Sequence, residues 1–343
     1  MRRLRRLYPL VAFLLVSAGT FLFLESQCGT EVSAVPPKEG LRVATWNVMF
    51  LDEDVPDERL ANLASVIRNL NADIIAFQEV SNVASLRAIL PADYEVAMTI
   101  ERGTQNLALA VRAPLEIQAT ADALFEGAAY DEAFPDYRDP LRVYVATPSG
   151  VQLAVYVVHL KSRSGGRRQT DYQRIAGASL LAGWIRARGE QNVILLGDFN
   201  DTPDDASLNI LETGDLLAVG RMENEEDRFL VNLCEPLFAR DMVTMEVYAL
   251  YRGSPIQPAV RGARKENDRW RGKDYSYPND LVIVQTMFDQ ILVSKALADV
   301  VVGGEARIYA GADALWGLKG NRGEGTLASD HLPVFADFRI AVR

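Results

Sequence analysis

Four short apolar segments, each with polar or ionisable residues at one end, constrain the fold of this 343-residue chain more than any other feature. They span residues 73–80, 153–158, 192–196 and 288–294, and they lead into or carry Gln78-Glu79, His159, Gly197-Asp198-Phe199-Asn200 and Asp289. Apolar runs of this length are typical of buried strands. Because a buried strand fixes the groups at its end, we expect several strands to deliver reactive side chains to the edge of a sheet.

The intervening segments show the spacing of helices. Residues 57–70 place Leu60, Leu63, Ile67 and Leu70 at helical intervals, and a second helix is expected over residues 170–188. Residues 41–48 add a further β-rich segment, and the sequence shows no internal repeat. We therefore predict one mixed α/β domain over residues 41–343. Within it, residues 206–285 contain an acidic run at 223–227 and a basic stretch at 261–273, and we expect long loops there.

The first 28 residues have the pattern of an export signal. Four arginines precede an uncharged apolar run at residues 7–24, whose length lies between that of a signal-peptide core and that of a membrane-spanning helix. A cleaved signal peptide and an uncleaved membrane anchor both remain open, and both predict a periplasmic, secreted or outward-facing domain. Cys28 raises lipid attachment as a third case, which the preceding Glu-Ser-Gln disfavours. Residues 29–40, with Pro36-Pro37, are expected to form a linker.

Net charge and cysteine content bear on the partners of this protein and on how its domain is stabilised. The formal charge of −10 becomes −13 without the four arginines and one glutamate of residues 1–28. That balance argues against a protein that coats nucleic acid with its whole surface, although it leaves a local basic groove open. Cys234 is the only cysteine of the predicted domain, so we expect a buried, inert thiol and no internal disulfide. We expect the domain to be a monomer.

The chain contains only two histidines, His159 and His331. Histidine is the side chain suited to proton transfer near neutral pH, and both occur beside acidic residues or after an apolar segment. A single histidine at a strand end is more often structural, whereas two of two in such settings favours catalysis. Asp289 is the candidate carboxylate that orients His331 and stabilises its charged form. His159 is expected to protonate the leaving oxygen or to contact the phosphate.

Acidic and amide residues at the strand ends fit the needs of phosphodiester hydrolysis. Such a reaction needs an activated water and charge stabilisation, which hard divalent cations held by carboxylates supply. Glu79 is the first candidate ligand for Mg²⁺ or Mn²⁺, with Asn47 and Asp330 as companions, although a carboxylate in the position of Glu79 alone is more often simply solvated. Asp198 would orient or deprotonate the water, and Asn200 would hold the phosphate or the carboxylate. Taken alone, this pair would equally form a capped turn.

Six segments in order make the chain resemble the endonuclease/exonuclease/phosphatase superfamily. These segments are Leu41–Asn47, Ile75–Glu79, Val158–Ser162, Gly197–Asn200, Asp289–Ser294 and Ser329–Val334. Each is a weak signal alone, but their order is specific, and the resemblance covers essentially the whole predicted domain. His159 makes the chain similar to the secreted deoxyribonuclease and sphingomyelinase branch, because abasic-site repair endonucleases usually have asparagine there.

The resemblance implies an α/β fold, a four-layered sandwich of two mostly antiparallel β-sheets flanked by helices. It implies one or two divalent metal ions, Mg²⁺ or Mn²⁺, with Asn47, Glu79 and Asp330 at the metal. It assigns Asp198 and Asn200 to the water and phosphate, and His331 to the phosphate with Asp289 behind it. Inositol-phosphate phosphatases of this superfamily also have histidine at the position of His159, but the segment after Asn200 shows no convincing extension of the kind they have.

Basic residues after His159 bear on the substrate. Lys161 and Arg163 are expected to contact substrate phosphates, as they follow His159 without an intervening acid. We predict an exported, metal-dependent phosphodiesterase, foremost a non-specific nuclease. A hydrolase of phospholipids or small phosphoesters is the first alternative, for which an uncleaved N-terminal segment in the membrane would give a rationale. A surface binding module without turnover is the second.

Overall fold

Strands that are apolar on both faces form the centre of the fold. In β1 (Leu41–Leu51), Leu41 and Val43 face the core between two sheets, whereas Ala44, Trp46 and Val48 face the core beneath the helices. Successive side chains of a strand point to opposite faces, so one sequence supplies both cores. A strand buried on both sides belongs to an inner layer, with further structure packed over each face.

The computed structural model describes residues 35–118, 122–163, 167–216, 228–240, 242–251, 254–257, 281–311, 313–314 and 328–342. One sheet has the strand order β15-β16-β1-β2-β4-β3, and the second has the order β10-β14-β9-β8-β7-β5, with β6 also paired to β7. The remaining strands of the first sheet are β2 (Ile74–Val80), β3 (Tyr94–Met98), β4 (Asn106–Arg112), β15 (Arg307–Ile308) and β16 (Val334–Phe338). Those of the second are β5 (Glu116–Ile117), β6 (Asp122–Ala123), β7 (Leu141–Ala146), β8 (Gln152–His159), β9 (Val193–Asp198), β10 (Val231–Asn232) and β14 (Asp289–Val293).

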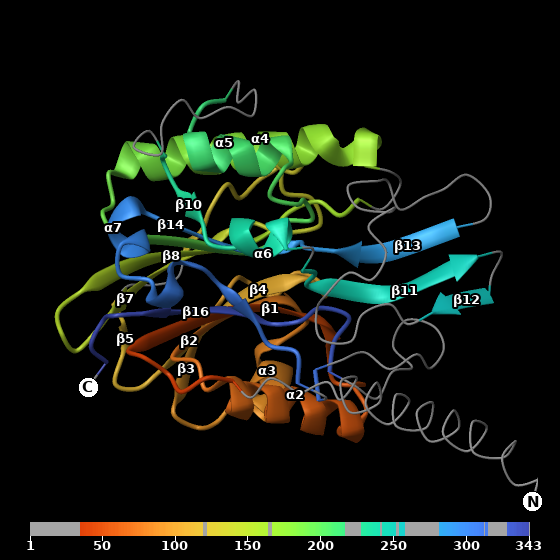
Figure 1. Cartoon of the computed structure of the whole chain (residues 1–343), viewed down its shortest axis with the longest axis horizontal. Helices are drawn as coiled ribbons and strands as arrows, with labels where there is room; N and C mark the ends of the chain where they lie inside the picture. The colour runs from red at the N-terminus through yellow and green to blue at the C-terminus, as the bar shows by residue number, and fades with distance from the viewer. Residues whose placement is uncertain are drawn as a thin grey trace, which may run out of the picture. The chain divides into compact units, whose positions relative to one another are not determined.

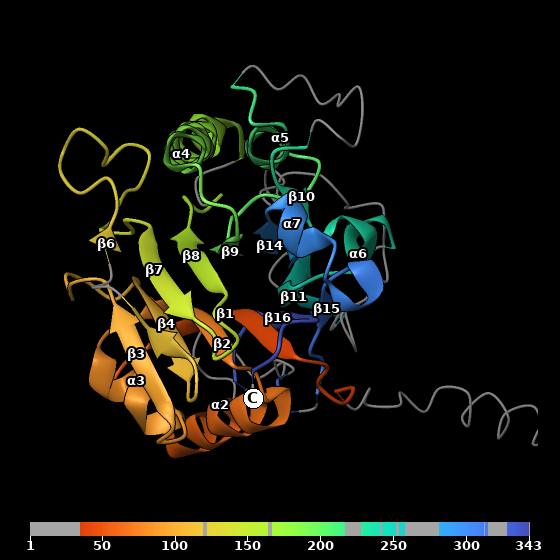
Figure 2. The ribbon, with the colours of Figure 1, turned by 90° about the vertical axis from the view of Figure 1, so that its left-hand side faces the viewer.

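Each sheet contains one parallel pair of strands among antiparallel neighbours. The parallel pairs are β1–β2 in the first sheet and β8–β9 in the second. The helices α2 (Asp57–Leu70) and α3 (Val83–Ile89) cover the outer face of the first sheet, and α4 (Arg167–Arg188) and α5 (Ala206–Thr213) cover that of the second (Figures 1 and 2). Short helices α6 (Glu235–Ala239) and α7 (Lys295–Ala298) and a 3₁₀ turn (Val302–Gly304) lie in connections. The predicted four-layered sandwich of mostly antiparallel sheets is confirmed.

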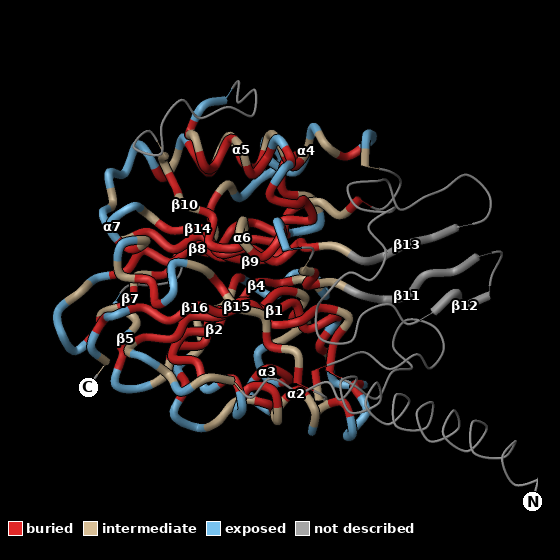
Figure 3. Tube along the Cα trace, viewed as in Figure 1, coloured by how far each residue is buried: buried red, intermediate tan, exposed pale blue. Residues whose placement is uncertain are grey.

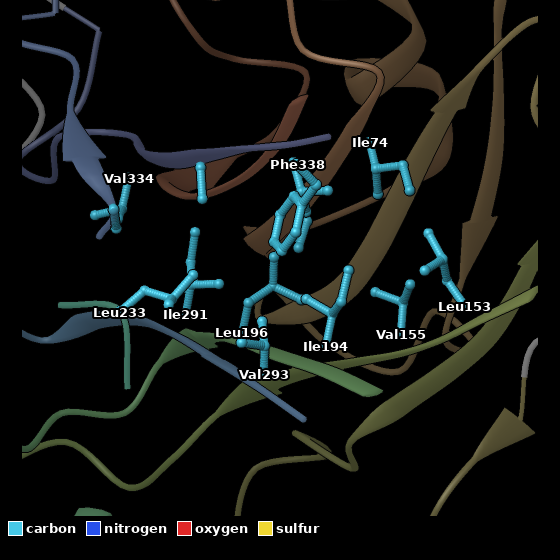
Figure 4. Close-up of a cluster of buried hydrophobic side chains, with 14 of the residues drawn as sticks. Ile74, Leu153, Val155, Ile194, Leu196, Leu233, Ile291, Val293, Val334 and Phe338 are labelled. Atoms are coloured by element: carbon cyan, nitrogen blue, oxygen red, sulfur yellow. The ribbon is translucent and has the colours of Figure 1, made fainter. Parts of the chain in front are cut away.

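The core between the two sheets is built from branched aliphatic side chains. Val155 of β8, Ile194 and Leu196 of β9 and Ile291 of β14 meet Phe338 of β16 across this layer (Figure 4). Buried positions run continuously along the central strands, while exposure concentrates in loops and on the outer sides of the helices (Figure 3). Burying each such side chain contributes about 1.5–3 kcal/mol, so the inter-sheet layer is a main source of stability.

The predicted elements agree with the structure except between residues 206 and 285. There we expected long loops, but the described parts contain α5, β10 and α6, together with β11 (Met245–Tyr251), β12 (Ser254–Gln257) and β13 (Leu281–Thr286). In the described part of this segment the prediction was wrong, because these elements are short and show little periodicity. The acidic run at 223–227 and the basic stretch at 261–273 lie outside the described residues.

Strands β11, β12 and β13 form a separate three-stranded antiparallel sheet, which we call the arm. The arm extends from one end of the sandwich (Figure 1). Its strand β13 ends at Thr286, three residues before β14 begins at Asp289. The arm therefore leaves the sandwich at the end where Asp289 lies.

The N-terminal predictions fall mainly outside the described residues, which begin at Val35. At the end of the predicted linker, Val35 packs against the core, and Lys38 forms an ion pair of 2.7 Å with Asp73. Within the portion of the chain that the structure describes, no helix combines the length and apolarity needed to cross a membrane. Cys234 is fully buried, and burial raises the pKa of its thiol to about 12, in agreement with the predicted inert cysteine.

Candidate active site

Strand register brings three of the predicted residues side by side. His159 at the end of β8 is paired with Asp198 at the end of β9, and Asp198 is paired with Asp289 at the start of β14. The parallel pair β8–β9 puts two strand ends at one edge, and the antiparallel strand β14 begins at the same edge. Residues far apart in sequence thus form a contiguous row.

His331 is held by Asp289 through a buried hydrogen bond of 2.8 Å between Nδ1 and Oδ2. The two side chains are buried, with Asp289 fully inaccessible to solvent. Burial alone would lower the pKa of His331, but the carboxylates of Asp289, Asp198 and Asp330 outweigh burial and raise this pKa well above its ordinary value. A charged His331 donates from Nδ1 to Asp289, which leaves its Nε2–H directed elsewhere.

The ring of His331 is also fixed through its backbone. Trp46 donates from Nε1 to the His331 carbonyl at 2.9 Å, and the His331 N–H donates to Ser329 Oγ at 3.1 Å. The Ser329 hydroxyl in turn donates to the Asn47 carbonyl at 2.7 Å. These contacts join the loop that carries His331 to β1.

His159 has the opposite electrostatic environment. Its Nε2 lies 3.3 Å from Arg138 Nη1, 3.5 Å from Asp198 Oδ2 and 3.9 Å from Glu79 Oε1. Burial first, and then Arg138, His331 and Lys161, lower the pKa of His159 well below its ordinary value. A neutral His159 that accepts a hydrogen bond from Arg138 carries no proton on Nε2. Donation of a proton from Nε2 to a leaving oxygen, one of its two predicted roles, therefore does not fit this environment, and the other role, contact with the phosphate, stays a prediction.

Asp198 lies between the two imidazoles. Its Oδ2 is 3.5 Å from His159 Nε2 and 3.9 Å from His331 Nε2, and its Oδ1 accepts the Asn200 N–H at 2.8 Å. Burial raises the pKa of Asp198, which the neighbouring charge of His331 partly opposes. The preceding Gly197 has φ +148°, and a Cβ there would overlap the Val158 carbonyl oxygen, so only glycine fits.

Asn200 supports Asp198 rather than standing free for a ligand. It adopts a left-handed conformation with φ 52°, and its Nδ2 donates to the Leu160 carbonyl at 3.0 Å. The Nδ2 bond fixes the turn after β9, and the backbone N–H of Asn200 in that turn orients the Asp198 carboxylate. Of its two predicted roles, holding the carboxylate agrees with these contacts.

The predicted metal ligands Glu79, Asn47 and Asp330 gather near this row. Glu79 has φ 61°, and its carboxylate accepts Asn47 Nδ2 and the Phe50 N–H, each at 3.2 Å. Burial, and next the charge of Asp330, raise the pKa of Glu79. The Glu79 and Asp330 carboxylates therefore repel each other in a site that is largely shielded from solvent. Within the described ranges no group of three or more His, Cys, Asp or Glu side chains is arranged to hold a metal ion.

Two carboxylates nevertheless suit Mg²⁺, which proteins commonly bind through one or two carboxylates, with water and substrate phosphate completing the shell. Glu79 and Asp330 would hold such an ion. Asn47 presents its amide nitrogen to Glu79 and Asp198, while its Oδ1 accepts the Met49 N–H at 2.9 Å. A metal ligand must present oxygen, so the predicted metal contact of Asn47 requires its amide to turn over.

Arg163, predicted to contact substrate, lies instead in a buried charge network. Its Nε donates to the Asn200 carbonyl at 2.8 Å, and its Nη2 binds Asp201 at 2.8 Å and also Asp205. Only 2% of its side chain is exposed. Every one of these partners belongs to the turn after β9, so Arg163 stabilises that turn. Lys161 is half-buried and close enough to His159 to lower the pKa of that imidazole.

Two buried arginines of the site were missed in the sequence. Arg138 donates from Nη1 to the Leu160 carbonyl at 3.1 Å and faces His159. Arg59 of α2 donates to the carbonyls of Val48 and Ala328. Arg138 precedes β7, which pairs antiparallel with β8, so a correct strand register would have placed it beside His159. No local pattern distinguishes Arg59 from other helical arginines.

Comparisons with known proteins identify the family of this chain. The family model for the endonuclease/exonuclease/phosphatase family matches residues 44–331. A search of curated proteins found no match. Solved structures with a similar fold include D. rerio TDP2 complexed with a single-strand DNA product, with 18% identity, coverage of 86% of this chain and 97% of that chain, and a TM-score of 0.54.

Two further solved structures have a similar fold. A mannosyl-6-phosphatase of Bacteroides thetaiotaomicron is 16% identical, with coverage of 87% of this chain and 99% of that chain and a TM-score of 0.53. The human Nocturnin catalytic domain with bound sulfate is 17% identical, with coverage of 89% and 96% and a TM-score of 0.50. At these identities the similarity shows the fold alone. The family match, which spans most of the chain, shows that the protein belongs to the endonuclease/exonuclease/phosphatase family, whose members hydrolyse phosphoric esters.

Proposed function

We propose that this protein is an exported phosphodiesterase that depends on a divalent metal ion and hydrolyses nucleic acid. The observation that carries the proposal is the position of Asp198 Oδ2, within 4 Å of two imidazoles whose environments favour opposite charge states. One imidazole is bound to a carboxylate and the other faces a guanidinium. Pairs of titratable groups whose pKa values are driven apart are typical of acid–base catalysis.

In this proposal Asp198 accepts the proton of the attacking water. Its raised pKa brings the carboxylate closer to the range in which a general base works near neutral pH. Asn200 keeps the Asp198 carboxylate directed through its backbone N–H. As the new phosphorus–oxygen bond forms, the bond to the leaving oxygen breaks.

His331 supplies the proton to the leaving oxygen. Because its Nδ1–H is bound to Asp289, the proton available for transfer is the one on Nε2. Before transfer, the charge of the imidazolium also stabilises the phosphate. Neutral His159 and the buried Arg138 guanidinium lie together beside Asp198, where the guanidinium contributes positive charge to the site.

Glu79 and Asp330 are the residues that would hold the divalent ion. A bound Mg²⁺ or Mn²⁺ would polarise a phosphate oxygen and stabilise the charge that develops on it. The repulsion between the two carboxylates, which raises the pKa of Glu79, is the observation that favours a cation there.

Nucleic acid is supported as the substrate by one relative and by the basic side chains near the site. The TDP2 structure with similar fold holds a single-strand DNA product. Lys161, which is half-buried, provides a positive charge beside His159 that could contact a phosphate backbone, and the buried Arg138 guanidinium adds positive charge behind it. Export is supported by the arginine-flanked apolar run of residues 1–28.

Hydrolysis assays on the full chain, purified in detergent, test the proposal. Plasmid DNA, RNA, sphingomyelin and a small bis-phosphodiester are each incubated with Mg²⁺ or Mn²⁺, with and without EDTA. We expect EDTA-sensitive cleavage of DNA or RNA, which Asp198→Asn and His331→Ala abolish.

Asp299→Asn serves as a matched carboxyl-to-amide control. Asp299 is exposed beside α7, at the end of the sandwich away from the arm (Figure 1), and this variant should keep full activity. Cleavage of sphingomyelin without cleavage of DNA or RNA would overturn the nuclease assignment. Cleavage that resists EDTA would refute the metal dependence. Binding of these substrates without hydrolysis of any of them would refute the proposal that the protein is an enzyme.

A further inference from the structure

The Asp289–His331 hydrogen bond joins two segments that no regular sheet pairing holds together. Asp289 is the first residue of β14, and His331 lies in the loop before β16. Among the described residues, the one sheet-type pairing of His331 is an isolated bridge with Met245, at the root of the arm. A fixed distance between these two segments therefore needs a connecting group.

Thr244 is placed to be that group. It is fully buried, and its Oγ1 accepts the backbone N–H of Phe288 at 3.0 Å and that of Asp289 at 3.1 Å. A threonine hydroxyl has two acceptor sites, and both serve the start of β14. The Thr244 hydroxyl thus fixes the backbone from which the Asp289 carboxylate projects.

The backbone of Thr244 holds the other partner. Its carbonyl accepts the N–H of Leu332, the residue after His331, at 2.6 Å. Its own N–H donates to the Thr286 carbonyl at 2.9 Å, which closes the arm at its root. One residue therefore contacts the segments of Asp289, of His331 and of both strands that lead into the arm.

We propose that Thr244 is a positioning residue that sets the geometry of the Asp289–His331 pair, and that the arm is anchored in the site through it. Without the hydroxyl, two buried N–H groups lose their acceptor, and the start of β14 shifts to find another. A displacement of this kind lengthens the bond between Asp289 and His331. Misplacement of a catalytic group by about 1 Å lowers turnover by on the order of 100-fold.

The test compares Thr244→Val with Thr244→Ser. Valine keeps the shape of threonine but removes the acceptor, whereas serine keeps the hydroxyl and removes a methyl group. Thr147→Val is the matched control, because the Thr147 hydroxyl also accepts a backbone N–H, from Val151 at 3.0 Å, in the β7–β8 turn.

The first readout is the low-field proton resonance of His331 Nδ1–H, which reports the hydrogen bond to Asp289 without any substrate. The chain contains only two histidines, so protein made without a histidine tag is assigned by comparison with His159→Gln. The second readout is the kcat and KM of nucleic-acid hydrolysis, which rests on the proposed function.

Thr244→Val is expected to weaken or abolish the low-field resonance and to lower kcat about 10- to 100-fold with KM little changed. Thr244→Ser is expected to restore both, and Thr147→Val to leave both at wild-type values. An unchanged resonance in Thr244→Val, or equal losses in the serine and valine variants, overturns the inference. If wild type hydrolyses none of the substrates, the proposed function fails while the resonance still decides the role of Thr244.

Discussion

Removal of the Arg163 side chain separates a structural role from substrate contact most sharply. The sequence places this arginine among residues expected to grip phosphates, whereas the structure surrounds it with Asp201, Asp205 and the Asn200 carbonyl. Arg163→Ala leaves two nearly inaccessible carboxylates without this cation. The variant should therefore lose folding stability before it loses affinity for substrate.

The size of the loss follows from the burial of the network. Breaking a buried ion pair by removing one partner costs about 3–5 kcal/mol. The guanidinium also lies 5.0 Å from the Phe288 ring centroid, a cation–π contact worth about 1 kcal/mol. Burial, and then the charge of Asp205, already raise the pKa of Asp201 to about 6, so protonation at low pH relieves part of the penalty. We expect a loss of about 4 kcal/mol at pH 8 and a smaller one at pH 5.

Urea unfolding followed by circular dichroism measures this difference. Arg240→Ala is the control, because Arg240 forms an exposed ion pair of 2.9 Å with Glu305, and removing such a pair costs at most about 1 kcal/mol. If Arg163→Ala unfolds within about 1 kcal/mol of wild type while its KM rises at least about tenfold, the buried-network explanation is refuted and the substrate contact stands.

Four further predictions follow from individual contacts. Arg138→Ala should lower kcat by about 100-fold through loss of the guanidinium that faces His159, and it should also lower the urea midpoint because a buried guanidinium that donates to the Leu160 carbonyl is lost; a full kcat contradicts its place in the site. Glu79→Gln should weaken Mn²⁺ binding in calorimetry, whereas Asp299→Asn should not, and equal affinities would remove Glu79 from the metal site. Glu212→Gln should stabilise the protein at pH 8 by up to about 3 kcal/mol and hardly at all below pH 4.5. Burial, and then Glu235, raise the pKa of Glu212 from 4.5 to about 7 in the folded state, so the charged form is penalised increasingly as pH rises through that window; a benefit that grows toward low pH has the wrong sign. Gly197→Ala should destabilise by at least about 2 kcal/mol because its Cβ overlaps the Val158 carbonyl, and an unchanged urea midpoint would show that β9 relaxes.

The sequence by itself determined the central elements and the inventory of the site. Apolar runs and helical spacing are local properties, so the strands that carry Glu79, His159 and Asp198 at or next to their last residue, and the helix over residues 57–70, were predictable. The order of short motifs also indicated the family and thereby the two-sheet sandwich. In the described part of residues 206–285, short elements without clear periodicity were not predictable.

Only the tertiary structure decided what each side chain does. His159 and His331 are both buried, yet burial and the Arg138 guanidinium lower the pKa of His159, whereas the Asp289 carboxylate overcomes burial and raises the pKa of His331. Arg163 was predicted to contact a phosphate, but in the structure it is a buried partner of Asp201 for the same reason. Charge state and contact depend on burial and on neighbours from distant segments, which strand register brings together and which no local pattern encodes.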